Sequence, residues 1–469
     1  MKKLLNSNQL KPSKYNYILN LEKNERVIYN TKTGAIDLVD QQTSPEFDRV
    51  MNSQFEQESE LVSYLIQSGY LVDKNTDEES EVRELGKKYN EVDNVLKLIL
   101  LPAEICNFAC PYCFIYTMRD RVMKKEVYDA TYKKIASFFR EMDKEKSAKL
   151  EISWYGGEPT LASNEIVEFM NKINELKASY SNIILVSNIV TNGYLLNYDL
   201  FRELYLSGIG HFQVTLDGDE VSHDKLRFLE GGKPTFRKIY ENLMEISRKA
   251  DKDCRFSFKI RANFTRNTVN NCKNLLEMFL RDFGNDSRFE IYFRPVYNFE
   301  TDKDTIDSIS SDICGIEEGL RQQNILTFIG GDKVYKEKVT NPLPRPIFAW
   351  CDYFQSNTHI IGWDGAIFSC DTLVVDKEKS IGMIDDEGNI VLNENSLIWS
   401  SYMLDDSSCN LIEQCLKCKR LPVCMGGCKR TRIDSGKNPC YWTDEIIYEA
   451  MREYADMYTE NTTKGVAVS

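Results

Sequence analysis

The sequence predicts an α/β protein in which a partial (β/α)6 TIM-like barrel lies between a small winged-helix-like module and a cysteine-rich domain. Three observations predict this order. A strand meander lies near the N-terminus, short apolar runs then alternate with amphipathic helical stretches, and a dense set of cysteines follows between Cys351 and Cys440. The 469 residues, 42% of them hydrophobic, are enough to bury several cores.

The N-terminal module, placed at residues 1–90, begins with β-branched and aromatic runs that predict three strands within residues 15–40. Helical patterns follow at residues 44–51 and 59–68. The polar, acidic residues 73–93 have few apolar side chains to bury, so they predict a solvated linker helix.

Six strand-forming runs alternate with helical stretches through the barrel, which is placed at residues 91–300. The runs occupy residues 96–105, 150–157, 183–193, 211–218, 256–264 and 289–296. Between them, apolar residues recur at three- and four-residue steps, which is typical of helices that pack on a parallel sheet. Such units curl into a barrel that presents its chemistry at the carboxyl ends of the strands.

Residues 301–350 carry no clear motif and are expected to bridge the barrel to the next domain. That domain is placed at residues 351–469, where eight of the 14 cysteines lie. A final helix is expected at residues 443–458.

The formal net charge of −13 argues against a nucleic-acid backbone or an anionic membrane as partner, because both attract basic surfaces. No run of about 18 apolar residues exists, and the N-terminus has no signal-peptide pattern. We therefore expect a cytoplasmic protein. Cysteines stay reduced in that compartment, so clustered cysteines favour metal binding or catalysis over disulfides.

Cys106, Cys110 and Cys113 stand in CNFACPYC, directly after the first barrel strand. Three thiolates are one short of a closed zinc site, and no histidine lies nearby. Three is the number needed for a four-iron cluster that keeps one iron open for a ligand. With Tyr112 before the last cysteine, the CxxxCxxC pattern resembles the radical S-adenosylmethionine (SAM) superfamily; structural zinc is the alternative.

This resemblance implies that the three cysteines hold a [4Fe-4S] cluster whose open iron binds SAM. Reductive cleavage of SAM then gives a radical that abstracts hydrogen from an unactivated C–H bond. Gly156, Gly157 and Glu158, in the GGEP that follows the second strand, resemble the family segment that contacts the SAM amino group. Inward polar side chains of the next strands would contact the SAM ribose and carboxylate: Asn192, Thr215 and Arg261.

The later cysteines form the pattern C, GxxxxC, CxxCxxxxxCxxxC, C, which resembles the SPASM extension of radical SAM enzymes. The resemblance implies two auxiliary iron–sulfur clusters, and so three [4Fe-4S] clusters in all. The outer cluster would be bound by Cys415, Cys418, Cys424 and Cys440, and the inner cluster by Cys351, Cys370 and Cys428. Either Cys409 supplies the fourth inner ligand or that iron is open to substrate. Two zinc knuckles are the alternative to both clusters.

Asp371 directly follows Cys370, at the position of a proposed general base in sulfatase-maturing relatives of this family. A carboxylate beside a cluster could take a proton while the substrate radical is oxidised. Asp371 is therefore the predicted catalytic residue, and a turn residue is the alternative.

The N-terminal module resembles a RiPP recognition element, where RiPP denotes a ribosomally made and then modified peptide. Natural-product maturases use this element to bind the leader of a precursor peptide. We therefore predict a radical SAM/SPASM peptide maturase that forms a thioether or carbon–carbon crosslink. A flavodoxin- or ferredoxin-like protein would donate the electron. One alternative is a maturase of a folded protein, by formylglycine formation or quinone-cofactor biogenesis, and another is a non-catalytic zinc-binding scaffold.

Overall fold

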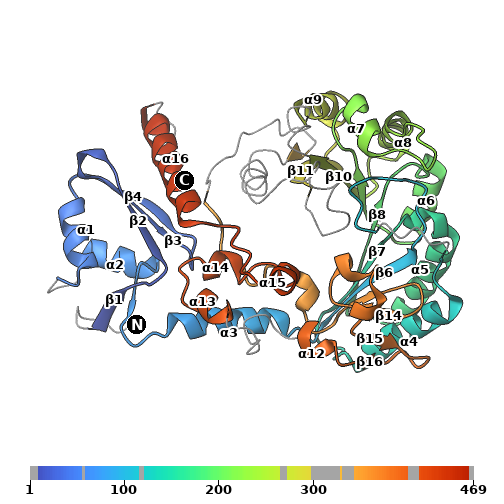
Figure 1. Cartoon of the computed structure of the whole chain (residues 1–469), viewed down its shortest axis with the longest axis horizontal. Coiled ribbons are helices and arrows are strands. Elements are labelled where there is room, and N and C mark those ends of the chain that lie inside the picture. The colour runs from blue at the N-terminus through green and yellow to red at the C-terminus, as the bar shows by residue number, and fades with distance from the viewer. Residues whose placement is uncertain are drawn as a thin grey trace. The chain divides into compact units, whose positions relative to one another are not determined.

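The computed structural model describes residues 9–54, 59–115, 121–264, 272–296, 328–329, 343–399 and 411–463 (Figure 1). The chain divides into two compact units. The barrel unit comprises Val92–Lys338 and Tyr353–Ser401, and the terminal unit comprises Met1–Glu91, Val339–Asp352 and Tyr402–Ser469.

Six parallel strands form the centre of the barrel unit in their sequence order, as predicted. They are β6 (Val95–Ala103), β7 (Ala148–Gly156), β8 (Ile183–Thr191), β9 (His211–Thr215), β10 (Ser257–Phe264) and β11 (Phe289–Pro295). Side chains such as Trp154 and Phe258 are 0% exposed, which is the burial expected of a sheet covered by helices.

The helices between these strands lie along the outer side of the sheet (Figure 1). The predicted helices are α4 (Lys125–Glu141), α5 (Ser163–Lys177), α6 (Tyr198–Leu206), α8 (Phe236–Lys249) and α9 (Cys272–Phe283). The sequence analysis did not predict α7 (Glu220–Leu226), which is short, nor the 3-10 turn at Pro159–Ala162.

The sheet continues beyond both ends of the predicted barrel. Strand β13 (Thr358–Ile361) pairs in parallel with β6, and β14 (Ala366–Phe368), β15 (Gly382–Ile384) and β16 (Ile390–Leu392) follow in antiparallel order before α12 (Ser396–Trp399). At the other edge, β12 (Phe328–Ile329) is antiparallel to β11. Residues 353–399 thus belong to the barrel unit, so the compact units do not divide at the predicted boundary at residue 351.

The terminal unit begins with the predicted meander, in which β2 (Asn16–Asn20), β3 (Arg26–Asn30) and β4 (Ile36–Val39) are antiparallel. Strand β1 (Leu10–Pro12) pairs with β5 (Leu71–Asp73), and the helices α1 (Ser44–Met51) and α2 (Glu60–Gln67) lie at their predicted positions.

Helix α3 (Glu78–Asn90) corrects the prediction of a solvated linker. Its Val82 is only 4% exposed and packs in a cluster with Tyr15, Leu421 and Met425. A few apolar residues on one face were enough to dock the helix, although the stretch is acidic overall.

The C-terminal segment of the terminal unit contains α13 (Leu411–Leu416), α14 (Leu421–Cys424), α15 (Lys429–Ser435) and α16 (Asp444–Thr463). Helix α16 lies against β2 and β3 (Figure 1), where Ile447 and Met451 pack with Tyr17 and Tyr29. The N-terminal module therefore shares its core with the C-terminal segment.

In the described part of the chain, no helix is both long and apolar enough to cross a membrane.

Candidate active site

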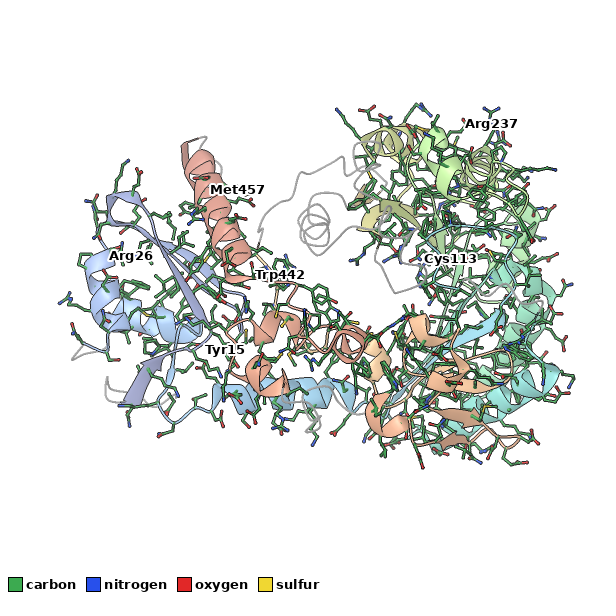
Figure 2. The ribbon with its side chains drawn as sticks, in the orientation of Figure 1. Tyr15, Arg26, Cys113, Arg237, Trp442 and Met457 are labelled. Atoms are coloured by element: carbon green, nitrogen blue, oxygen red, sulfur yellow. The ribbon has the colours of Figure 1, made fainter. Side chains whose placement is uncertain are left out.

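The loop that carries Cys106, Cys110 and Cys113 follows β6 and is held from two sides. On one side, the Gly157 and Glu158 amides donate to the carbonyls of Ala103 and Ile105, at 2.9 Å each. On the other, the segment after α7 pairs with the loop: Ala109 N donates to Phe228 O at 2.9 Å and Glu230 N to Asn107 O at 3.0 Å. Cys113 lies among the strands of the barrel unit rather than its outer helices (Figure 2).

Two glycines of the GGEP segment allow this close approach. A Cβ at Gly157 would lie 2.4 Å from Ile105 O and 2.6 Å from Glu104 O. Gly156 has a φ of +123° and faces Ala103 O, where a Cβ would come within 2.7 Å. The backbone these glycines approach is that of the cysteine loop, so they set the position of the three thiols.

Glu158 joins the ends of two strands. Its carboxylate is 0% exposed. One oxygen accepts from Thr160 N (3.0 Å), Thr160 Oγ1 (2.5 Å) and Thr191 Oγ1 (2.6 Å), and the other accepts from Asn192 N (2.7 Å). Burial raises the pKa of Glu158, and these hydrogen bonds oppose the rise. The structure thus gives Glu158 a scaffolding role, and its contact with SAM stays a prediction.

The other predicted SAM residues lie at the same end of the sheet. Asn192 donates from Nδ2 to Asn107 Oδ1 at 2.7 Å and points to Cys106 Sγ at 3.9 Å. Thr215 and Arg261 face each other in register across β9 and β10. Side chains paired in this way leave the same face of a sheet, so Thr215 and Arg261 line one surface.

A buried triad that sequence reasoning missed supports the cysteine loop. Tyr112 donates to Asp217 Oδ2, and Arg227 NH1 donates to Tyr112 OH at 2.7 Å and lies 4.0 Å from Asp217. Asp217 also accepts from Asn263 N at 2.9 Å. No sequence pattern marks Arg227, which ends α7 directly before the segment that pairs with the cysteine loop.

Burial governs the protonation of the three thiols. It raises the pKa of Cys106 to about 12 and that of Cys110 to about 11, and it also raises the pKa of Cys113. The Arg227 guanidinium opposes the rise at Cys110 and Cys113. Neutral thiols bind metal poorly, so a bound metal would be needed to hold all three as thiolates.

The number of these thiols favours a cluster over one ion. A tetrahedral zinc, with Zn–S bonds of about 2.3 Å, draws its ligands close together. Among the described residues, no three histidine, cysteine, aspartate or glutamate side chains converge on the position of a single metal ion. In a four-iron cluster each thiolate binds a different iron, so the sulfurs stand further apart. Three cysteines on one loop are the number that leaves one iron of such a cluster open for a ligand.

Asp371 begins a 3-10 turn (Asp371–Leu373) directly after β14 and Cys370. Its Oδ2 accepts from Tyr353 OH at 3.3 Å. Burial raises the pKa of Asp371, and the Arg261 charge opposes the rise. Tyr155, which precedes the two glycines, has a pKa raised by burial and then by the Asp371 charge. The barrel unit thus brings the predicted base close to a predicted SAM residue and to the GGEP segment.

The four predicted ligands of the outer cluster come together in the terminal unit. Burial raises the pKa of Cys424 to about 12, and the charges of Cys418, Cys415 and Cys440 contribute. Gly427, with a φ of +75°, makes the turn that lets this segment pass Pro439 O, where a Cβ would lie 2.7 Å away.

The predicted inner ligands do not all lie in one unit. Cys370 belongs to the barrel unit, whereas Cys351 and Cys428 belong to the terminal unit. Cys409 lies outside the described residues. The inner ligand set stays a prediction.

Comparison with known proteins supports the chemistry of this site. Residues 100–284 match the Radical SAM superfamily. Over 382 residues the chain is 26% identical to a cysteine-type anaerobic sulfatase-maturating enzyme of Clostridium perfringens. The match covers 77% of this chain and 96% of that enzyme. Over 125 residues it is 30% identical to a PqqA peptide cyclase of Bradyrhizobium diazoefficiens, covering 27% of this chain and 29% of that protein.

The fold is also similar to that of a solved structure, native anSMEcpe with bound AdoMet and a Cp18Cys peptide. The TM-score is 0.53 at 19% identity, and the match covers 79% of this chain and 99% of that chain. At this identity the likeness supports the fold alone.

Proposed function

The chain is a radical SAM enzyme, and we propose that it matures a peptide or protein by oxidising one of its residues. The observation that carries this proposal is the convergence in the barrel unit. The three-cysteine loop lies against the GGEP segment, and Asp371 lies near Arg261 and Tyr155. A base beside a radical-generating site suits an oxidation in which the substrate loses a hydrogen atom and then a proton and an electron.

The described residues fit the expected cofactors. Cys106, Cys110 and Cys113 would hold the [4Fe-4S] cluster with one iron left open. Arg227 is buried, and its Nε has no hydrogen-bond partner among the described residues, so it would bind the SAM carboxylate. When bound, SAM and the reduced cluster supply a carbon-centred radical that takes a hydrogen atom from a substrate C–H bond.

Asp371 would complete the oxidation. After the substrate has lost a hydrogen atom, its radical must lose one electron and one proton to form a new double bond. Asp371 would accept the proton, and its buried position makes its carboxylate a stronger base than an exposed one. An auxiliary iron–sulfur cluster would accept the electron. A flavodoxin- or ferredoxin-like protein would supply the electron that starts the next cycle.

The relatives favour formylglycine-type oxidation of a residue in a protein. The sulfatase-maturating enzyme is matched along 96% of its length, and its name describes the maturation of a protein of the cysteine type. This likeness supports a maturase of a folded protein more than an enzyme that forms a thioether or carbon–carbon crosslink. The relatives give no specific support for such a crosslink. We therefore place formylglycine-type oxidation first.

One observation keeps the crosslinking of a ribosomal precursor peptide as a second candidate. The meander β2–β3–β4 forms a separate small sheet, and in the described residues β4 pairs only with β3. The free edge of β4 would accept an extended leader peptide as a fourth strand. The match to the sulfatase-maturating relative covers 77% of this chain and almost all of the relative. This chain is therefore long enough to contain an additional module.

Product analysis separates the two candidates. Anaerobically reconstituted enzyme, SAM and dithionite would be incubated with a sulfatase-derived peptide that has one cysteine, and with the same peptide carrying alanine there. Small peptides encoded beside the gene would be tested in parallel. A hydrazide-reactive aldehyde supports the first candidate, and loss of two hydrogens without an aldehyde supports the second. If no SAM is cleaved although iron and sulfide are fully loaded, the proposal fails.

A further inference from the structure

Two arginines donate to the sulfurs of two predicted outer-cluster cysteines. Arg420 donates from Nε to Cys418 Sγ at 3.4 Å, and its backbone N–H lies at the same distance from that sulfur. Arg432, which is only 4% exposed, points NH2 to Cys415 Sγ at 3.6 Å and donates to Gly426 O at 2.5 Å. Two of the four sulfurs therefore face a guanidinium group.

A chain of polar contacts ties Arg420 to the N-terminal meander. Arg420 NH1 lies 3.3 Å from Asp444 Oδ1, at the start of α16. The same oxygen accepts from Tyr17 OH at 2.6 Å. Tyr17 belongs to β2 and is 2% exposed. The contacts thus run from strand β2 through Asp444 and Arg420 to the sulfur of Cys418, all within the terminal unit.

These contacts would affect electron transfer by changing the reduction potential of a cluster bound at Cys418. A reduced cluster carries one more negative charge than an oxidised one, so nearby positive charge and hydrogen bonds to its sulfurs stabilise the reduced state. The effect is larger in a buried site, where water screens charge less. Arg420 would therefore raise the reduction potential of a cluster bound at Cys418.

We propose that Arg420 is a positioning residue that raises the reduction potential of the outer cluster, and that Tyr17 of the meander holds it in place through Asp444. The proposal rests on the proposed function, and on the predicted binding of the outer cluster by Cys415, Cys418, Cys424 and Cys440. It makes the N-terminal module part of the outer-cluster site: without the Tyr17 hydroxyl, Asp444 would bind Arg420 alone and draw it away from Cys418.

The test is an EPR-monitored redox titration of the reconstituted full-length protein. The wild-type enzyme would be compared with R420Q, Y17F and K417Q, and C424A would identify the titration step of the outer cluster. Lys417 is exposed and stands next to Cys418 in sequence without a described contact to its sulfur, so K417Q controls for simple loss of a positive charge. Iron per chain would be measured for every variant.

The expected result is a lower midpoint potential for the outer step in R420Q, a smaller decrease in Y17F and no change in K417Q. Equal potentials in wild type and R420Q, or an equal decrease in K417Q, would overturn the proposal. If R420Q fails to load iron, Y17F decides, because it removes one oxygen only and an unchanged potential then refutes the link. If wild type and C424A titrate identically, no cluster sits on these cysteines, and the cluster assignment itself is wrong.

Discussion

At Gly157, one methyl group would decide whether the cysteine loop keeps its place. A Cβ there would lie 2.4 Å from Ile105 O, and backbone cannot give way as a flexible side chain can. We expect G157A to displace the loop, so that the reconstituted enzyme lacks the cluster on Cys106, Cys110 and Cys113. The measurement is iron and sulfide per chain, with a loss of about four irons relative to wild type.

Gly210 provides the matched control. It lies in the same unit, just before β9, and a Cβ there would meet nothing within 4 Å. G210A should therefore load iron as wild type does. Full iron content in G157A would refute the idea that these glycines set the position of the cysteine loop.

Asp371 is predicted to act after hydrogen abstraction. In D371N the shape of the side chain is kept but the base is lost, so SAM should still be cleaved while product formation falls about 100-fold or more. The measurement is the ratio of 5′-deoxyadenosine to oxidised product. D376N, which changes a half-exposed carboxylate nearby, should keep the wild-type ratio. Parallel losses of cleavage and product in D371N would point to a structural role instead.

Among the helices and strands, the sequence predicted those whose pattern of apolar residues extends over many consecutive positions. The strands of the barrel are runs of seven to nine apolar-rich residues, apart from β9, and the helices between them repeat their apolar positions along one face. Strands β13 to β16 have only three or four residues, too few to show a period, and β13 joins β6 from a distant part of the chain. Their pairing depends on tertiary contacts that no local pattern records.

The same distinction holds within the site. Cysteine spacing and the GGEP segment are local patterns, and the structure places the GGEP segment against the loop of Cys106, Cys110 and Cys113. No such pattern marks Arg227 or Tyr155. Arg227 is placed by the pairing of the segment after α7 with the cysteine loop, and Tyr155 by the approach of β7 to the turn that contains Asp371. The acidic residues 73–93 gave a wrong prediction because their overall composition suggested a solvated linker. The few apolar residues on the buried face of α3 were given too little weight.

Strand β13 carries a pH-sensitive group. Burial, and then the Lys134 charge, lower the pKa of His359 to about 4 from its usual value of about 6.5. The unfolded chain therefore binds a proton near pH 6.5 that the folded chain does not accept until about pH 4, so stability falls as pH drops through this window. We expect the loss at His359 to reach at most about 3 kcal/mol.

The check is the urea midpoint of the wild-type protein and of H359Q between pH 7 and pH 4. H359Q keeps a neutral polar side chain, so its midpoint should fall less steeply with decreasing pH. Identical pH dependence in both proteins would show that His359 does not carry the effect.

At the scale of the whole molecule, the terminal unit joins the two ends of the chain. Meander residues Tyr17 and Tyr29 pack on Ile447 and Met451 of α16, and Thr31 Oγ1 donates to Lys419 O at 2.5 Å, beside the outer-cluster cysteines. The N-terminal module and the C-terminal segment with the predicted outer-cluster cysteines therefore share one core. We infer that neither folds independently of the other.

This inference predicts that a cavity in the C-terminal helix destabilises the N-terminal strands. Met451 is 0% exposed, so M451A should cost about 2–5 kcal/mol and raise amide hydrogen exchange in β2 and β3 at least about tenfold, although the substitution lies in α16. M457A is the matched control, because Met457 lies on the same helix, is partly exposed and is absent from this core. If M451A accelerates exchange in α16 alone, the meander is an independent domain; if β2 and β3 respond with α16, the N-terminal module and the C-terminal segment form one cooperative unit.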